Sequence, residues 1–203
     1  MIRNVVFDMG GVLIHYEFSR YCRRYAAEDA DHALLMDELF GSTEWVQLDR
    51  GSIEQGQAIR SICSRLPERL HGAVGEILNN WHAGATPIEG MDALVRRIKT
   101  AGYGVYLLSN AAKTVHAYAP NLPGYDCFDG LFISADWHLL KPDAAIYRAF
   151  CDEFRLNAAE CIFVADLSVN VEGAMHAGMY GIVFRGDAAR LERELAARGV
   201  RLP

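Results

Sequence analysis

The sequence predicts an α/β protein, in which helices cover both faces of a parallel β-sheet and a helical segment follows the first strand. Three observations predict this fold class. Short apolar runs occur at the N-terminus and again through the second half of the chain. Apolar stripes with helical spacing separate the later runs, and residues 16–86 carry helical stripes with no convincing strand. Strands without alternating polar residues are typical of parallel sheets that are covered on both faces.

Five apolar runs are the predicted strands. The first ends at Asp8, where a polar turn with two glycines begins, and the others are also followed closely by turn-forming residues. The five runs are Ile2–Phe7, Val105–Leu108, Leu131–Ile133, Cys161–Ala165 and Ile182–Phe184.

Helices are predicted between the later strands. One stripe begins at Met91 and ends at Gly102, because Met91, Leu94, Val95 and Ile98 recur at helical spacing. The second is opened by Pro142 in its first turn and runs through Phe150. The third contains Val171, Ala174 and Met175 and ends at Gly178. Strand and helix thus alternate from about residue 88 onward, which is typical of βαβ units.

Residues 16–86, called the helical insert below, carry helical stripes at Leu34–Phe40, Ile59–Leu66 and Leu70–Trp81. A capping box at Ser52–Gln55 is expected to start the helix of the second stripe. An insert at this point of the chain stands over the carboxyl end of the first strand, where ligands bind in open α/β sheets.

Composition excludes several classes of protein. The chain has 203 residues, 51% of them hydrophobic, and 20 Lys and Arg against 26 Asp and Glu give a net charge of −6. The absence of a basic stripe argues against nucleic acid or an anionic membrane as a partner. No transmembrane run or signal peptide is expected, and the five scattered cysteines form no CxxC pair. We therefore expect the cysteines to be buried thiols and the protein to be cytoplasmic. We also expect a monomer or a homodimer.

Polar groups that could perform chemistry follow four of these segments. Asp8, Ser109 with Asn110, Lys141, and Asp166 each follow a predicted strand, and Lys141 does so after a short loop. Singly they are explained as turn formers, helix caps or surface residues. Together, at one edge of a sheet, they suit phosphoryl transfer. One carboxylate serves as nucleophile, a second helps to hold Mg²⁺, and the hydroxyl, amide and ammonium groups bind phosphoryl oxygens.

The same residues resemble the four motifs of the haloacid dehalogenase-like (HAD) hydrolases, in order and spacing across nearly the whole chain. The matching segments are Phe7–Leu13, Leu108–Asn110, Leu140–Asp143 and Phe163–Ala174. The resemblance implies a Rossmann-like core of residues 1–15 and 87–203 and identifies residues 16–86 as the α-helical cap. It implies an Mg²⁺-dependent phosphatase that acts on a small phosphorylated metabolite, for example a sugar phosphate, through an aspartyl-phosphate.

The resemblance also implies roles for individual residues. Asp8 is similar to the nucleophile and to a metal ligand, and Asp166 to the second metal carboxylate. Gly10 would contribute its backbone carbonyl to the metal. Ser109 and Lys141 would hold the phosphoryl oxygens, and Asn110 would contact the substrate.

Two residues depart from the family pattern. Most phosphatases of the family carry an acid where this chain has Gly10, and a second acid where it has Ala165. General acid–base catalysis typically contributes about 10²–10⁴-fold. Without it, we expect anomeric, acyl or aryl phosphates to react faster than primary alkyl phosphates. His15 is a candidate substitute acid, and the loss at Ala165 is expected to weaken Mg²⁺ binding.

Two other functions remain open on the sequence. A 2-haloacid dehalogenase would use the same aspartate without a metal, although Asp166 would then repel an anionic substrate. A weakly active or non-catalytic phosphate-binding module is the other alternative. Residues of the insert that could set specificity are Arg23, Arg24, Trp45, Gln47, Asp49 and Arg50.

Overall fold

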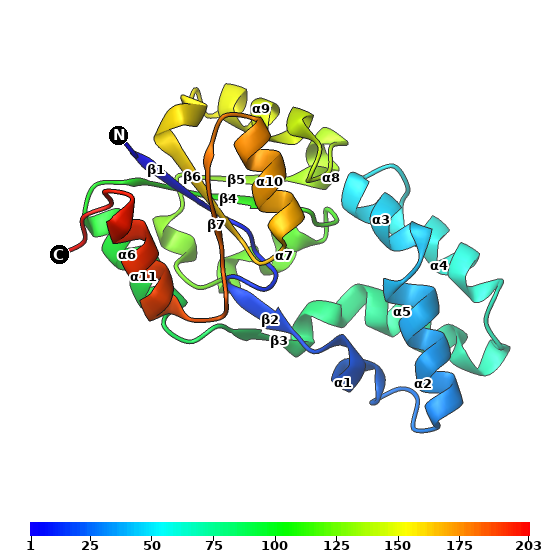
Figure 1. Ribbon diagram of the computed structural model, residues 1–203. Coiled ribbons are helices and arrows are strands. Elements are labelled where there is room, and N and C mark those ends of the chain that lie inside the picture. The colour runs from blue at the N-terminus through cyan, green and yellow to red at the C-terminus, as the bar shows by residue number, and fades with distance from the viewer.

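The computed structural model describes residues 1–203 and contains a five-stranded sheet in the order β5-β4-β1-β6-β7 (Figure 1). All four strand pairs are parallel, which confirms the predicted sheet. The strands are β1 (Asn4–Phe7), β4 (Gly104–Ser109), β5 (Gly130–Ile133), β6 (Cys161–Ala165) and β7 (Tyr180–Val183). The last strand begins two residues before the predicted run, because Tyr180 pairs with Ile162 of β6.

Helices cover both faces of the sheet. Alternate residues of β1 enter different hydrophobic clusters, with Val6 in one and Val5 and Phe7 in the other. The cluster around Val6 contains residues of α9 (Ala144–Glu153) and α10 (Ser168–His176). The opposite cluster contains residues of α6 (Met91–Thr100) and α11 (Ala188–Ala197). This alternation follows from the period of two along a strand.

Two details of the core helices differ from the sequence-based expectation. Pro142 precedes α9 instead of opening it, because the helix begins at Ala144 with the Asp143 carboxylate capping the Ala145 amide. The Lys141–Pro142 peptide is cis. Met175, which was expected in the apolar stripe of α10, is 57% exposed. The buried residues of that helix include the smaller Val171 and Ala174, and also the polar Asn170.

Short elements complete the core. They are α7 (Val115–Tyr118), η4 (Ala119–Asn121), η5 (Tyr125–Cys127), α8 (Ser134–Trp137) and η6 (Ala158–Glu160). The chain ends both lie at the side of the sheet opposite the helical insert (Figure 1).

The helical insert stands beyond the carboxyl ends of the strands, and all its elements between the short strands at its two ends are helices (Figure 1). They are α1 (Phe18–Cys22), α2 (Asp29–Leu35), η1 (Met36–Phe40), α3 (Thr43–Arg50), α4 (Gln55–Cys63), η2 (Glu68–Leu70), α5 (His71–Asn80) and η3 (Trp81–Gly84). The sequence did not indicate the two strands at its ends, β2 (Ile14–Tyr16) and β3 (Ala85–Pro87), which pair antiparallel. This ribbon joins the insert to the core.

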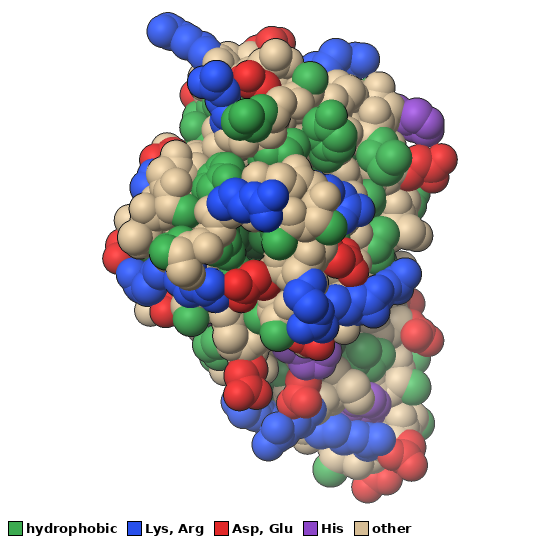
Figure 2. Space-filling view, turned by 60° about the vertical axis from the view of Figure 1, so that its left-hand side comes forward, with side chains coloured by type: hydrophobic (Ala, Val, Ile, Leu, Met, Phe, Trp, Pro, Cys, Tyr) green, Lys and Arg blue, Asp and Glu red, His purple; other side chains and the backbone are tan.

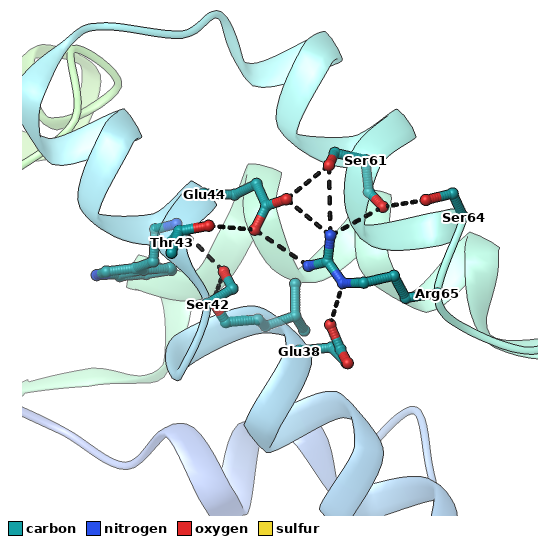
Figure 3. A network of polar contacts seen from close by, with 9 residues as sticks. Glu38, Ser42, Thr43, Glu44, Ser61, Ser64 and Arg65 are labelled. Carbon is teal, nitrogen blue, oxygen red and sulfur yellow. Dashed lines mark hydrogen bonds and ion pairs between the residues drawn. The ribbon is translucent and has the colours of Figure 1, made fainter.

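Polar contacts fix the helices of the insert to one another. Arg65 bridges Glu44 of α3 and Glu38 of η1, with Nη1–Oε1 and Nε–Oε2 distances of 2.8 and 2.6 Å (Figure 3). Ser61 donates a 2.6 Å hydrogen bond to the same Glu44 carboxylate (Figure 3). The capping box of α4 is formed by Glu54 and Gln57, two residues beyond the predicted Ser52.

The surface carries charges of both signs. Lys and Arg side chains are interspersed with Asp and Glu across the face shown in Figure 2. Ion pairs on the molecule include that of Arg97 with Glu192 at 2.7 Å. No helix combines the length and the apolar character that crossing a membrane requires. All five cysteines are free thiols.

Candidate active site

Three of the predicted site residues meet at one edge of the sheet. Asp8 follows β1, Ser109 ends β4 and Asp166 follows β6, and these strands are neighbours. Parallel neighbours bring their carboxyl ends together, which explains the placement. Lys141 reaches the same point from the loop after α8. A cavity of about 460 Å³ lies between this edge and the insert, and its lining includes Asp8, Ser109, Asn110, Lys141, Asp166 and Asn170.

Asp8 and Lys141 form a buried ion pair. The Lys141 ammonium lies 2.6 Å from Asp8 Oδ1, and both side chains are almost fully buried. The ammonium also donates to the Leu108 carbonyl at 2.9 Å and lies 5.2 Å from the centre of the Phe163 ring. Burial lowers the pKa of Lys141, while Asp8, Asp166 and Asp49 act in the opposite direction. Asp8 Oδ1 accepts a second hydrogen bond from the Met9 amide, which leaves Oδ2 free.

Asn110 binds the backbone of Lys141. Its side-chain nitrogen donates to the Lys141 carbonyl at 3.0 Å, and its side-chain oxygen accepts from the Lys141 amide at 2.9 Å. This reciprocal pair holds the loop that carries the ammonium. Ser109 is 1% exposed, and its hydroxyl makes only a long, 3.4 Å bond to the Asn110 carbonyl. It is therefore available to a ligand in the cavity.

Asp166 lies close to Asp8 and against Gly11. A Cβ at Gly11 would come within 2.3 Å of Asp166 Oδ2, and Gly11 has a φ of +68°. Burial raises the pKa of Asp166, and the nearby Asp8 raises it further. Oδ1 accepts from the Leu167 amide, which leaves Oδ2 free. Each carboxylate thus keeps one oxygen without a hydrogen bond.

This donor set fits Mg²⁺. Two carboxylate oxygens whose charges repel each other, together with a backbone carbonyl, are the oxygen ligands that Mg²⁺ prefers, and they would hold the ion here. Asn170, for which the sequence indicated no individual role, is 6% exposed and lines the cavity from the first turn of α10. The signal that could have found it is a polar residue on the inner face of α10.

Gly10 faces an aromatic ring. A Cβ at Gly10 would lie 2.7 Å from Cε2 of Tyr16, so the ring fills the space in which a longer side chain would stand. The Tyr16 hydroxyl is buried near the Tyr118 side chain, and burial raises its pKa well above the ordinary value.

Aromatic side chains form the wall of the cavity on the side of the insert. Phe18 and Tyr16 stack at 5.3 Å between ring centres, and Trp81 meets both Tyr16 and Trp45 edge-on at 5.0 and 5.8 Å. Four rings, those of Tyr16, Phe18, Trp45 and Trp81, line the cavity. Most of the wall opposite the phosphoryl-binding residues is therefore apolar.

Two of the candidate specificity residues of the insert reach the cavity, Trp45 and Asp49. Arg23 instead pairs with Asp29 at 2.7 Å, and Arg24 lies over the Tyr21 ring at 5.2 Å. Gln47 and Arg50 are exposed and do not line the cavity. Burial raises the pKa of Asp49 to about 7. A hydrogen bond from the Ala112 amide and the charge of Lys141 lower this pKa by smaller amounts. His15 lies at the mouth of the cavity and is exposed.

Comparisons with known proteins agree on the family. The model of the haloacid dehalogenase-like hydrolases matches residues 2–178. The chain is 30% identical to the sesquiterpene phosphatase astK of Aspergillus oryzae, over 87% of each protein. A HAD-like hydrolase from Porphyromonas gingivalis has a TM-score of 0.76 at 21% identity, covering 99% of this chain and 100% of that one. A HAD family enzyme from Bacteroides thetaiotaomicron, solved with magnesium and inorganic phosphate, has a TM-score of 0.72 at 20% identity. The match covers 94% of this chain and 99% of that one.

Proposed function

This chain belongs to the haloacid dehalogenase-like hydrolase family, and from that premise we propose that it is an Mg²⁺-dependent phosphatase with Asp8 as its nucleophile. The observation that carries the proposal is the buried Asp8–Lys141 pair, 2.6 Å apart, beside the second carboxylate of Asp166 at the same cavity. A carboxylate in this setting forms an aspartyl-phosphate by attack on phosphorus.

We propose that Asp8, Asp166 and the Gly10 carbonyl hold the metal, with Asn170 as a further oxygen ligand close by. The bound cation would offset the repulsion between the phosphate dianion and the two carboxylates. Lys141 is the cation that this chain itself supplies to the cavity, and it faces Asp8, Asp166 and Asp49. Its ammonium and the Ser109 hydroxyl would bind the phosphoryl oxygens, on which charge accumulates in the transition state.

Asn110 has a different role in this proposal from the substrate contact expected on sequence. Because both functional atoms of its side chain bind the Lys141 backbone, we assign it the positioning of the lysine. We also propose different roles for the core and the insert. Residues 1–15 and 87–203 would supply the nucleophile and the groups that bind metal and phosphate, and residues 16–86 would act as the cap that contacts the organic part of the substrate.

The aromatic wall supports an apolar alcohol as that organic part. A sugar needs several hydrogen-bond partners, whereas the wall formed by Tyr16, Phe18, Trp45 and Trp81 offers mainly ring faces and edges. The similarity to a sesquiterpene phosphatase also supports an apolar alcohol. We therefore favour the monophosphate of an isoprenoid or similar hydrocarbon alcohol over a sugar phosphate.

The test compares n-octyl phosphate with glucose 6-phosphate in the presence of Mg²⁺, with Asp8→Asn as the inactive control. We expect higher kcat/KM for the octyl ester and complete loss of phosphate release in Asp8→Asn and in EDTA. Preference for the sugar ester would refute the substrate class alone. Metal-independent chloride release from 2-chloropropionate would establish the dehalogenase alternative, which the unfavourable pairing of Asp8 and Asp166 argues against.

A further inference from the structure

The proposed reaction lacks an obvious proton donor. A primary alcohol leaves as a strongly basic alkoxide unless it receives a proton, and position 10, which could have supplied an acid, is a glycine covered by the Tyr16 ring. The other titratable groups that line the cavity outside the phosphoryl-binding residues are His15, Tyr16 and Asp49. Asp49 comes from the insert and thus from the side on which the alcohol is expected.

Asp49 is held in place by contacts between the insert and the core. Its carboxylate accepts a hydrogen bond from the Ala112 amide, and its backbone carbonyl accepts one from Ser134 Oγ at 2.5 Å. The next carbonyl, of Arg50, is bound by His138 Nδ1 at 3.1 Å. These contacts fix the last turn of α3 against the core.

Gly51 makes this close approach possible. It has a φ of +69°, and a Cβ there would lie 2.2 Å from the Ala135 carbonyl oxygen. The Asp49–Gly51 turn is therefore pressed against α8, and Asp49 lines the same cavity as Asp8 and Lys141. A catalytic acid must be positioned by its surroundings, and this turn provides the positioning.

We propose that Asp49 is the general acid and base of the reaction, in place of the residue missing at position 10; this rests on the proposed phosphatase function. In the first step an Asp8 oxygen bonds to phosphorus, the P–O bond to the alcohol breaks, and the Asp49 carboxyl gives its proton to the departing oxygen. In the second step water attacks phosphorus and the bond to Asp8 breaks. Asp49 takes one proton from that water, the other stays on the released phosphate, and both carboxyl groups return to their initial states.

The alternatives are less suited to both steps. Tyr16 keeps its proton because burial raises its pKa far above neutral, so its hydroxyl can donate a hydrogen bond but cannot return as a base. His15 lies at the mouth of the cavity and is exposed to solvent, so its surroundings do not hold it in place as they hold Asp49. A carboxyl with a pKa of about 7 is available in both forms near neutral pH. Lys141, Tyr16 and Tyr118 are the charged and titratable groups that face it.

An acid at Asp49 changes the substrate preference that Gly10 led us to expect from the sequence. A preference for aryl, acyl or anomeric phosphates was expected because Gly10 had no evident replacement. With Asp49 as the acid, a primary alkyl phosphate is a competent substrate, and the preference appears only when Asp49 is changed.

The test is Asp49→Asn, which keeps the size of the side chain and the oxygen that accepts from Ala112. Two substrates are compared, n-octyl phosphate, whose alkoxide needs a proton, and p-nitrophenyl phosphate, whose phenolate does not. We expect kcat/KM for the octyl ester to fall by about 10²–10⁴-fold, and that for the nitrophenyl ester to change far less. Asp37→Asn, an exposed aspartate of the insert, is the matched control and should behave as wild type for both esters.

A pH profile gives a second readout that a structural role would not change. In the wild type, kcat/KM for the octyl ester should fall as the pH rises above about 7, because the acid must be protonated. Asp49→Asn should lack this fall, and the nitrophenyl ester serves as the control for titration of the phosphate itself. Three results would overturn the acid role of Asp49 and leave the proposed phosphatase function standing. They are an equal fall of kcat/KM for both esters in Asp49→Asn, no fall for either ester, and a wild type that hydrolyses only the nitrophenyl ester. A wild type inactive on both esters would refute the proposed function and this inference with it.

Discussion

The ring of Tyr16 occupies the space that a side chain at position 10 would need, since a Cβ there would lie 2.7 Å from its Cε2 atom. The glycine in the first motif and the tyrosine at the end of β2 are therefore one structural unit. Restoring an aspartate at position 10 would not by itself restore the acid found in other members of the family, because the ring would have to move first.

Gly10→Asp should destabilise the protein by about 1–3 kcal/mol, the usual cost of overpacking. The measurement is urea unfolding of Gly10→Asp, Tyr16→Ala and the double variant. The double variant should be more stable than the sum of the two single effects implies, because the smaller residue at position 16 makes room for the carboxylate. If the stability changes of the two single variants simply add in the double variant, the Tyr16 ring and an aspartate at position 10 do not compete for the same space.

Gly11→Ala should weaken Mg²⁺ binding and activity, because its Cβ would come within 2.3 Å of Asp166 Oδ2 and displace that carboxylate. The matched control is Gly178→Ala. Gly178 also has a positive φ, of +93°, but its nearest neighbour would be 3.7 Å away. Both variants bear the backbone strain, so only Gly11→Ala should require more Mg²⁺ for half-maximal activity. A similar Mg²⁺ requirement in the two would contradict the placement of Asp166 at the metal.

Lys141→Met should abolish most activity and cost about 3–5 kcal/mol of stability, because it leaves the buried Asp8 carboxylate without its partner. The stability is measured without Mg²⁺, so that metal binding does not compensate. Adding Asp8→Asn to Lys141→Met should recover part of the loss, since the uncompensated charge is then gone. A double variant less stable than Lys141→Met would show that the pair is not coupled in this way.

The strands and the residues at their ends were predictable because the signal is local. An apolar run that stops at Asp8 or Asp166 contains both the strand and the site residue that follows it. The ribbon of β2 and β3 was missed because each strand has only three residues and its partner lies about seventy positions away. The importance of Tyr16 and Asn170, and the engagement of Asn110 with Lys141, depend on which backbone segments meet, and no spacing within the sequence records this.

The salt bridge inside the insert gives a prediction about pH. Arg65 lowers the pKa of Glu44 to about 2, and the Glu44 side chain is 9% exposed. Because the folded-state pKa is depressed, this stabilisation is complete above about pH 4.5 and is lost as the pH falls toward 2. Arg65→Met should therefore cost about 1–3 kcal/mol at neutral pH, between the values for buried and exposed pairs, and progressively less on acidification.

The control for this experiment is Arg69→Met. Arg69 makes a similar 2.7 Å contact with Asp31, but its side chain is 63% exposed. Arg69→Met should cost little stability, because solvent screens an exposed ion pair. Thermal or urea unfolding of both variants between pH 7 and pH 3 checks the difference, and equal losses at neutral pH would contradict the importance of burial at Glu44.

Both ends of the polypeptide lie on the side of the sheet away from the helical insert (Figure 1), and the Pro203 carbonyl is bound by Arg97 of α6. An affinity tag, a fluorescent fusion or a tether to a solid support can therefore be attached at either end without obstructing the mouth of the cavity. The protein can be immobilised for ligand-binding measurements with the reactive edge of its sheet directed toward the solution.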